Sequence, residues 1–521
     1  MSILAIDAGT TGVTALVIRP DGSVAGRGYQ EFRQHYPRPG WVEHLPEEIW
    51  QATLAACTTA YERASASDRD QPAQPGRSYQ SAPDPITCVG LTNQRETAVI
   101  WDRATLTAPR RAVVWQDRRS TGICERLRAD GHEPRFTELT GLRLDPYFTG
   151  TKLTWLAEHE PSLWAGVRDG SLAVGTVDSY LIARMTGGRR YVTDASNASR
   201  TLLFDIRAGQ WSDELCELLR VPSSALPEVV PSWGCAGETD PGAFLGLSVP
   251  VAGIAGDQQA ALFGQACFTP GDTKCTYGTG SFVLVNTGSS APDPGGSLLA
   301  TVAWMDPCGD LTYALEGSVF VTGAAVQWLR DGLGLLDNAA QSEALAASVP
   351  DSGGVVFVPA LTGLGAPDWD PDARGAIFGI TRGTTRAHLV RATLEAIAFE
   401  VRDVCGVLAS VSGSEPAVLR VDGGASANDL LMQLQADQLQ VAVERPVIAE
   451  TTALGAGFMA GLATGVWSST SEVSAVWELD RRFSPGARDE EAYARWRSAV
   501  ERSKGWARIA PSPARGRSYP R

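Results

Sequence analysis

The chain has 521 residues, more than one hydrophobic core usually holds, so we expect two large domains. Hydrophobic residues make up 44% and charged residues 20%, which excludes a disordered chain. The formal net charge of -14 opposes a nucleic acid or an anionic membrane as partner. No stretch approaches the roughly 18 apolar residues that a transmembrane helix needs, so we expect no integral membrane segment.

The nine cysteines are scattered through apolar contexts and form no C-x-x-C pair. We therefore expect reduced, mostly buried thiols in a cytoplasmic protein. The N-terminus lacks a basic region and its apolar run is interrupted by Asp7, so it is not a secretory signal.

The first predicted element is a hairpin over residues 3–18, in which two β-branched runs flank a turn of Gly and Thr. Glycines let the backbone turn sharply beside a ligand, while Thr10 and Thr11 offer N–H and hydroxyl donors to phosphate oxygens. Asp7, at the end of the first strand, can hold Mg²⁺ through water. An ordinary hairpin with a Gly-rich turn fits the same residues equally well.

Residues 24–32 predict a third strand and residues 47–63 a helix. Residues 65–85 are polar, contain four prolines and show no periodicity, so we expect a flexible surface insertion. Strands are then expected at residues 86–92, 99–101 and 112–115. Helical patterns, loops and strands alternate from there to about residue 200, which indicates the α/β class.

The second half repeats the opening design. Residues 249–256 form an apolar run that ends on Asp257, and residues 271–285 read as strand, Gly-Thr-Gly turn and strand. Two hairpins of phosphate-binding type suggest two similar domains facing a nucleotide from both sides, although the similarity is too short to prove a repeat.

Three further segments complete the pattern. Residues 389–408 have a helical period, and residues 417–428 read as strand, Gly-Gly turn and helix start, whose N–H groups can meet a phosphate. Small residues at helical spacing over residues 455–463 predict a close helix-packing face. The Pro-, Arg- and Ser-rich end from about residue 507 is expected to fray.

Several nucleotide and hydrolase chemistries are excluded. None of the three lysines follows Gly, so no P-loop is present. The five histidines form neither H-R-D nor H-E-x-x-H, which excludes the protein-kinase loop and the zincin helix. Residues 424–428 lack the second Gly of a nucleophile elbow. A nucleotide site built from hairpins and carboxylates remains.

Nine motifs carry the strongest signal, at residues 7–11, 39–44, 92–97, 145–148, 196–201, 253–265, 277–280, 362–367 and 420–424. Together they resemble the FGGY carbohydrate kinases of the actin/hexokinase/Hsp70 superfamily, and within them the glycerol kinase branch. The resemblance covers residues 3–506. It implies an α/β fold of two actin-like (ribonuclease H-like) domains with an interdomain active-site cleft. The N-terminal, polyol-binding domain is expected over residues 1–264, the C-terminal, nucleotide-binding domain over 265–506, and a disordered tail over 507–521.

The resemblance implies ATP-dependent phosphorylation of glycerol to sn-glycerol 3-phosphate, with Asp257 as general base and Mg²⁺ beside Asp7 and Asp257. Glycerol is expected to contact donors, acceptors and aromatic walls: Arg95, Glu96, Trp115, Tyr147, Asp257, Gln258 and Phe282. ATP or ADP is expected to contact Thr10, Thr11, Thr279, Gly323, Gln327, Gly424 and Asn428.

The chain departs from the family at Thr14, where Arg or Lys is usual, which removes a cation from the phosphate region. The loop at residues 241–248 carries Phe244, Leu245 and Ser248 where responsive relatives bind fructose 1,6-bisphosphate with glycines and an Arg, so we expect no inhibition by that effector. Two alternatives stay open: a sibling kinase acting on another polyol or a ketose such as xylulose, and a non-metabolic actin-like ATPase. The sequence also leaves open whether the protein forms a homodimer or a homotetramer.

Overall fold

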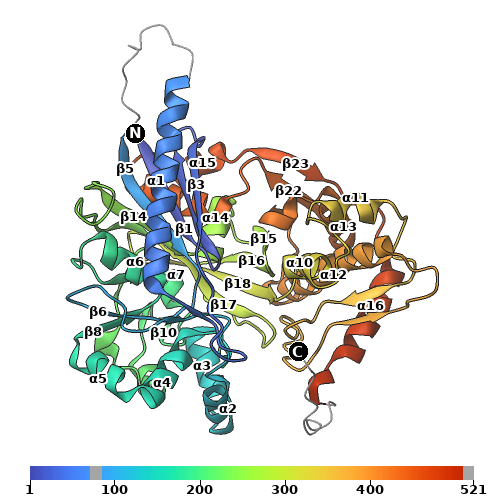
Figure 1. Cartoon of the computed structure of the whole chain (residues 1–521), viewed down its shortest axis with the longest axis horizontal. Helices are drawn as coiled ribbons and strands as arrows, with labels where there is room; N and C mark the ends of the chain where they lie inside the picture. The colour runs from blue at the N-terminus through green and yellow to red at the C-terminus, as the bar shows by residue number, and fades with distance from the viewer. Residues whose placement is uncertain (71–84, 509–521) are drawn as a thin grey trace, which may run out of the picture. The chain divides into compact units, whose positions relative to one another are not determined.

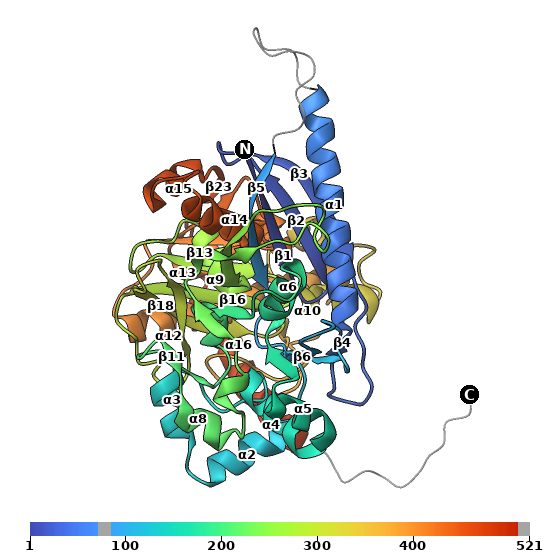
Figure 2. The ribbon, with the colours of Figure 1, turned by 90° about the vertical axis from the view of Figure 1, so that its left-hand side faces the viewer.

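The computed structural model describes residues 1–70 and 85–508, which form two compact units that interleave along the chain (Figures 1 and 2). The first unit comprises Met1–Asp272, Val285–Leu315 and Glu450–Glu478. The second comprises Thr273–Leu284, Glu316–Ala449 and the described part of Leu479–Arg521. Mixed sheets flanked by helices confirm the α/β class. Among the described residues, no helix combines the length and the apolar character needed to cross a membrane.

The first unit is organised around a six-stranded sheet of order β13-β14-β5-β1-β2-β3. β1 (Ser2–Ala8) and β2 (Gly12–Ile18) form the predicted hairpin, and β3 (Val24–Glu31), the predicted third strand, pairs antiparallel with β2. β5 (Ile86–Asn93) runs parallel to both β1 and β14 (Pro250–Gly256). These three strands therefore end at one edge, and the residues that follow them are brought together there.

Different helices cover the two faces of this sheet. Ile6, on one face, belongs to a core cluster with residues of α1 (Pro46–Asp70), whereas Ala5, on the other, lies near α14 (Thr451–Ala463). Figure 1 shows α14, coloured orange-red, beside the blue strand β1 of the same unit.

The small residues of α14 are a packing face, as predicted. A Cβ atom at Gly455 would lie 1.8 Å from the carbonyl oxygen of Ala260 on α9 (Asp257–Gly264), a distance that no side chain permits. The helix can approach α9 this closely only because the position has no side chain.

The sheet of the second unit contains strands in the order β18-β16-β15-β21-β22-β23. β15 (Thr273–Tyr277) and β21 (Val418–Asp422) are parallel neighbours, with Thr276 opposite Asp422. The predicted Gly-Thr-Gly and Gly-Gly turns both follow these strands, so they leave the sheet at the same edge.

One helix differs from its prediction. α1 continues to Asp70, seven residues beyond the predicted end near Arg63, because no Gly or Pro interrupts the Ala-, Ser- and Arg-containing segment that follows. The expected flexible insertion therefore begins as helix. The rest of it, residues 71–84, and residues 509–521 of the expected disordered tail lie outside the described part of the chain.

The remaining elements complete the two units. In the first unit the strands are β4 (Glu43–His44), β6 (Val99–Asp102), β7 (Ala112–Val113), β8 (Leu172–Gly175), β9 (Val192–Asp194), β10 (Phe204–Asp205), β11 (Gln210–Trp211), β12 (Glu228–Val230), β13 (Trp233–Glu238) and β17 (Leu299–Met305). Its helices are α2 (Thr121–Ala129), α3 (Glu133–Thr140), α4 (Thr149–His159), α5 (Pro161–Asp169), α6 (Val177–Met185), α7 (Ala195–Ala198), α8 (Asp213–Leu218), η1 (Ser223–Ala225) and α15 (Thr470–Val476). The second unit adds β19 (Val356–Val358), β20 (Ala376–Phe378), β22 (Ala442–Pro446), β23 (Leu479–Phe483), α10 (Gly323–Asp331), α11 (Gln341–Ala347), α12 (Arg386–Ser412), η2 (Gly424–Ala427), α13 (Asp429–Leu439), α16 (Glu490–Ser503) and η3 (Trp506–Arg508). β16 (Ser281–Gly288) and β18 (Leu311–Val319) each contribute residues to both units.

Candidate active site

The predicted phosphate-binding hairpin is present in the first unit. Asp7 lies near the end of β1, directly opposite Thr14 on β2, and the intervening turn carries Thr10 and Thr11. Thr11 is exposed, while the half-buried Thr10 accepts a hydrogen bond at its hydroxyl from the Trp115 indole N–H (2.9 Å). The turn is therefore held to Trp115, another predicted site residue, while Thr11 is exposed to solvent.

Asp7 has an unusual electrostatic environment. Its Oδ1 atom is shielded from solvent and has no hydrogen-bond partner among the described residues. Burial, and secondarily the charge of Asp257, raise the pKa of Asp7 to about 8. A carboxylate left without a donor next to a second carboxylate is a site that gains from a bound cation.

Arg95 and Asp257 meet at the shared edge of β5 and β14. The Arg95 Nε atom lies 3.0 Å from Asp257 Oδ1, and the same oxygen accepts the Gln258 backbone N–H at 2.7 Å. The Arg95 side chain is 2% exposed and the Asp257 side chain 27%, so the carboxylate reaches solvent while its cation stays buried. The parallel strands thereby bring together residues that are more than 160 positions apart in the sequence.

Glu96 is held in an uncommon backbone conformation. Its φ angle is +61°, in the left-handed region that non-glycine residues seldom adopt, and its side chain is buried. Its Oε1 atom lies 3.9 Å from Arg95 Nε. A buried, charged residue in a strained conformation favours a functional position over a structural one.

Two aromatic residues lie beside these charges. The Trp115 and Tyr147 rings pack edge to face, with centroids 5.5 Å apart and an interplanar angle of 79°. The sequence did not point to Lys152, a fully buried residue of α4 whose Nζ atom donates a hydrogen bond to the Tyr147 carbonyl oxygen. Burial lowers the pKa of Lys152 to about 7. Its one visible signal was a lysine within an otherwise uncharged stretch of helix.

Five of the predicted nucleotide residues line one cavity of about 400 Å³ in the second unit. It lies where the turns after β15 and β21 face the first turn of α10 and the start of α13. Its wall is largely apolar, with Val326, Leu394 and Leu431 contributing, which suits a flat heteroaromatic ring. The five residues are Thr279, Gly323, Gln327, Gly424 and Asn428.

The cavity also has a wall that the sequence did not predict. Ala339, Ala340, Ser342 and Glu343 enter it from the start of α11. Ser342 Oγ accepts a hydrogen bond from Asn428 Nδ2 (3.2 Å), and Glu343 Oε2 accepts one from the Asp429 N–H (3.2 Å). These contacts join segments that are far apart in sequence, and no local pattern marked the α11 segment as part of a site.

Phe282 is the one predicted polyol residue in the second unit, on β16, where it is half-buried.

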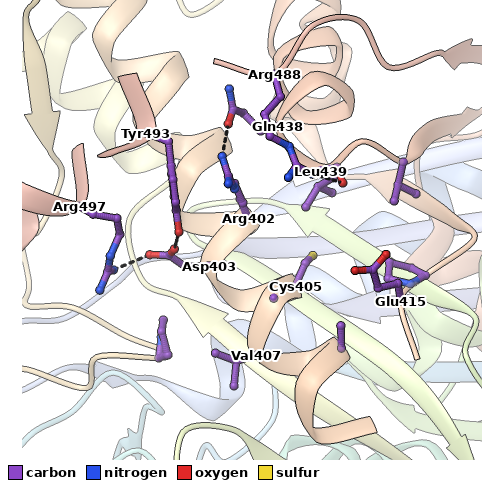
Figure 3. A pocket seen from close by; sticks show the side chains of 15 residues that line it. Arg402, Asp403, Cys405, Val407, Glu415, Gln438, Leu439, Arg488, Tyr493 and Arg497 are labelled. Atoms are coloured by element: carbon purple, nitrogen blue, oxygen red, sulfur yellow. Dashed lines mark hydrogen bonds and ion pairs between the residues drawn. The ribbon is translucent and has the colours of Figure 1, made fainter. Parts of the chain in front are cut away.

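A further cavity of about 490 Å³ in the second unit contains none of the predicted site residues (Figure 3). Its arginines already face acceptors. Arg402 contacts Gln438 and Glu490, and Arg497 contacts Asp403, which also accepts the Tyr493 hydroxyl. Each of the three arginines that line this cavity, Arg402, Arg488 and Arg497, is therefore already paired with a carboxylate.

Comparison with known proteins agrees with this arrangement. Residues 2–264 match the N-terminal domain of the FGGY family of carbohydrate kinases, and residues 273–464 match its C-terminal domain. The chain is 52% identical to a glycerol kinase of Bordetella parapertussis, covering 98% of this chain and 99% of that protein. It is 53% identical to a glycerol kinase of Symbiobacterium thermophilum, with 97% and 99% covered. The crystal structure of Plasmodium falciparum glycerol kinase with ADP superimposes with a TM-score of 0.85 at 34% identity, covering 96% of this chain and 98% of that one.

Proposed function

The chain belongs to the FGGY family of carbohydrate kinases, and on that premise we propose that it phosphorylates glycerol to sn-glycerol 3-phosphate with ATP. The observation that carries the proposal is a series of contacts in the first unit. Arg95 pairs with Asp257 and lies near Glu96. Arg200 links Glu96 to the Tyr147 ring, which packs against Trp115. The alternatives of a xylulose-type substrate and of an actin-like ATPase without a metabolite substrate are not favoured by relatives that are about half identical over nearly their whole length.

Glycerol is a chain of three carbons with a hydroxyl on each, so it needs hydrogen-bond donors and acceptors on one side and an apolar surface on the other. Arg95 supplies donors, and Glu96 and Asp257 supply acceptors. The Trp115 and Tyr147 rings supply the apolar surface. Gln258 and Phe282 complete the proposed set, Gln258 through its position next to Asp257.

For the nucleotide, we assign the adenosine part to the cavity lined by Thr279, Gly323, Gln327, Gly424 and Asn428. The volume of about 400 Å³ suits a nucleoside, and the N–H groups at the start of α10 and α13 suit its phosphates. Thr10 and Thr11 in the first unit are the proposed phosphate donors from the N-terminal hairpin.

Asp7 and Asp257 fit a magnesium ion that accompanies ATP. Among the described residues no group of three or more His, Cys, Asp or Glu side chains could enclose a metal. Mg²⁺ does not need such a group, because it keeps several waters and commonly binds one or two carboxylates plus substrate phosphates. The unpartnered Oδ1 of Asp7 supports this assignment. When bound, the ion would offset the negative charge of the phosphates.

Asp257 is the proposed general base. Arg95 and the Gln258 N–H both contact its Oδ1 atom, which fixes the orientation of the carboxylate. The carboxylate would accept the proton of the primary hydroxyl as that oxygen attacks the γ-phosphorus in line with the leaving ADP. The aromatic pair and the buried Arg95 would hold the hydroxyl in place, since positioning is the main source of rate in phosphoryl transfer.

We further infer a cytoplasmic location, supported by nine free cysteines of which seven are buried. The net charge of -14 opposes a nucleic-acid partner. The oligomeric state, homodimer or homotetramer, stays a prediction to be measured.

The test is a coupled assay of ADP release with purified protein, comparing glycerol, dihydroxyacetone, xylulose, ribulose and gluconate. We expect kcat/KM to be highest for glycerol by at least about tenfold, since a site built for three vicinal carbons fits longer chains poorly. A higher kcat/KM for xylulose than for glycerol would make a ketose the substrate. ATP hydrolysis that none of the five compounds stimulates would indicate the actin-like ATPase instead.

A further inference from the structure

We propose that Arg200 is a positioning residue of the polyol site, one that holds the Glu96 carboxylate and the Tyr147 ring in the orientation that glycerol requires. The inference rests on the proposed function. Arg200 itself would touch no substrate, and it would act through two residues that do.

The first contact is an ion pair in the protein interior. Arg200 Nε donates to Glu96 Oε1 at 2.7 Å, and the two side chains are 0% and 2% exposed. The second cation near this oxygen, Arg95, is farther away at 3.9 Å and lies closer to Asp257. Arg200 is therefore the principal charge partner of Glu96, which leaves Arg95 available to Asp257.

The second contact is with aromatic faces. The Arg200 guanidinium carbon lies 5.6 Å from the centroid of the Tyr147 ring and 5.3 Å from that of Phe148. A guanidinium over a ring is attracted by the ring's negative face, and the attraction strengthens when both groups are shielded from water. One side chain thus orients an acceptor and an apolar wall of the same proposed site.

Arg200 is itself held rigidly. It follows α7, whose N-terminal end is capped by the Asp194 carboxylate through the N–H groups of Ser196 and Asn197. The Asn197 side chain exchanges hydrogen bonds of 3.0 and 3.2 Å with Asn93, the last residue of β5. The strand that presents Glu96 is therefore tied to the segment that presents Arg200.

The buried Glu96 carboxylate needs a cation such as Arg200 beside it. A buried carboxylate is costly unless a cation and hydrogen bonds compensate it, and Glu96 cannot withdraw easily because its backbone is fixed at φ +61°. The planar guanidinium can meet the carboxylate edge-on and the rings face-on at the same time. A lysine could supply the charge but not the two-sided contact.

The experiment uses Arg200→Met and Arg200→Lys in the full chain, with Arg207→Met as the matched control. Arg207 is an exposed arginine seven positions away, and its guanidinium donates a hydrogen bond to the Glu138 backbone carbonyl. We expect Arg200→Met to raise KM for glycerol by about tenfold or more, the loss expected for a charge-assisted contact, with KM for ATP within about twofold of wild type. Arg200→Lys should recover part of the difference, and Arg207→Met should match wild type.

A double-variant cycle separates positioning from a general structural role. If Arg200 acts through Glu96, adding Arg200→Met to Glu96→Gln should raise KM for glycerol by less than about threefold beyond Glu96→Gln alone. Full additivity, an equal rise in KM for both substrates, or failure of both Arg200 variants to fold would make Arg200 a structural residue and overturn the inference. A wild-type enzyme that does not phosphorylate glycerol would instead remove the proposed function, an outcome visible before any variant is compared.

Discussion

At the scale of single residues, the proposed base can be removed without disturbing its neighbours. In Asp257→Asn the amide oxygen can still accept the hydrogen bonds from Arg95 and the Gln258 N–H, because both use Oδ1. We expect kcat to fall by at least about two orders of magnitude, the usual value of a positioned base, with the melting temperature and glycerol binding retained. Steady-state kinetics measures kcat, thermal unfolding measures the melting temperature, and calorimetric titration measures glycerol binding. The exposed Asp293→Asn is the control, and near-normal kcat in Asp257→Asn would assign the proton to another acceptor.

The raised pKa of Asp7 predicts how the stability of the folded protein depends on pH. Burial, and secondarily the charge of Asp257, raise the pKa of Asp7 from its ordinary value of 3.8 to about 8 in the folded protein. Between these two pH values the folded state therefore holds a proton that the unfolded state has lost. Stability from this group is complete below pH 3.8 and is lost as pH rises to about 8. Asp7→Asn should therefore melt higher than wild type in metal-free buffer at pH 8.5, with a difference that shrinks steadily toward pH 4.5. A difference independent of pH would contradict the assignment.

Thr14 provides a second variant that tests the charge environment of Asp7. It stands directly opposite Asp7 in the β1–β2 register, where cross-strand side chains share a face. An arginine there would place a cation beside the carboxylate and lower its pKa. We expect Thr14→Arg to reduce the pH dependence of the melting temperature and to tighten ADP binding by about 0.3–1 kcal/mol. In an Asp7→Asn background the same substitution should leave the pH dependence unchanged.

Strand ends and Gly-rich turns leave local signals in the sequence, and these signals made Asp7 and Thr10 candidate site residues. Asp7 and Thr10 follow from the hairpin pattern alone. The contacts of Glu96 could not be predicted in this way, since Arg200 is more than a hundred positions distant and its partner is chosen by the packing of α7 against the end of β5.

At the scale of elements, the close packing of α14 against α9 can be tested by adding one methyl group to Gly455, with one added to a glycine of another helix as the control. Gly455→Ala would push a Cβ into the Ala260 carbonyl on α9, and backbone cannot move aside cheaply. We expect a loss of about 2 kcal/mol or more, seen as a lower midpoint in urea unfolding.

The matched control is Gly406→Ala in α12, where a Cβ would meet no heavy atom within 4 Å. Alanine costs less backbone entropy than glycine in a helix, so this variant should be more stable by about 0.5–1 kcal/mol. Equal effects of the two substitutions would show that packing against α9 is not what requires Gly455.

Elements with a strong period were predicted closely, including β1, β2, β5 and α12. The α11 segment that lines the nucleotide cavity was missed because its residues form a short helix with weak periodicity, and only contacts with Asn428 and Asp429 give it a role. The end of α1 was misplaced because polar residues such as Ser65 are compatible with both helix and loop.

At the scale of the whole molecule, we expect no inhibition by fructose 1,6-bisphosphate. The loop at residues 241–248 carries a fully buried Phe244 side chain where responsive relatives have glycine-rich backbone. Ser248 Oγ donates a hydrogen bond to the Glu238 carboxylate at 2.6 Å. A phosphate there would meet the Glu238 carboxylate, and the neighbouring Arg189 is already paired with Asp240. Titration to millimolar effector in the glycerol assay, with light scattering in parallel, tests this, and strong inhibition with a change in particle mass would refute it.

The two compact units of the structure exchange segments at several points along the chain, and no feature of the sequence indicated this interleaving. The expected domain boundary near residue 264 stays a prediction. Each exchange depends on pairing between distant segments, such as β15 with β21, and no local pattern encodes a partner that lies about 150 residues away.

The position of α14 in the chain has a consequence for synthesis. This helix covers one face of the sheet formed by β1, β5 and β14, yet a ribosome makes it only after the entire intervening sequence. A nascent chain ending at Asp272 therefore carries all six strands of that sheet with an uncovered apolar surface that includes Ala5 and the bare backbone of Gly90. Folding of the first unit must wait for residues 451–463, and until they emerge the growing polypeptide is a natural client for a chaperone that shields apolar surface.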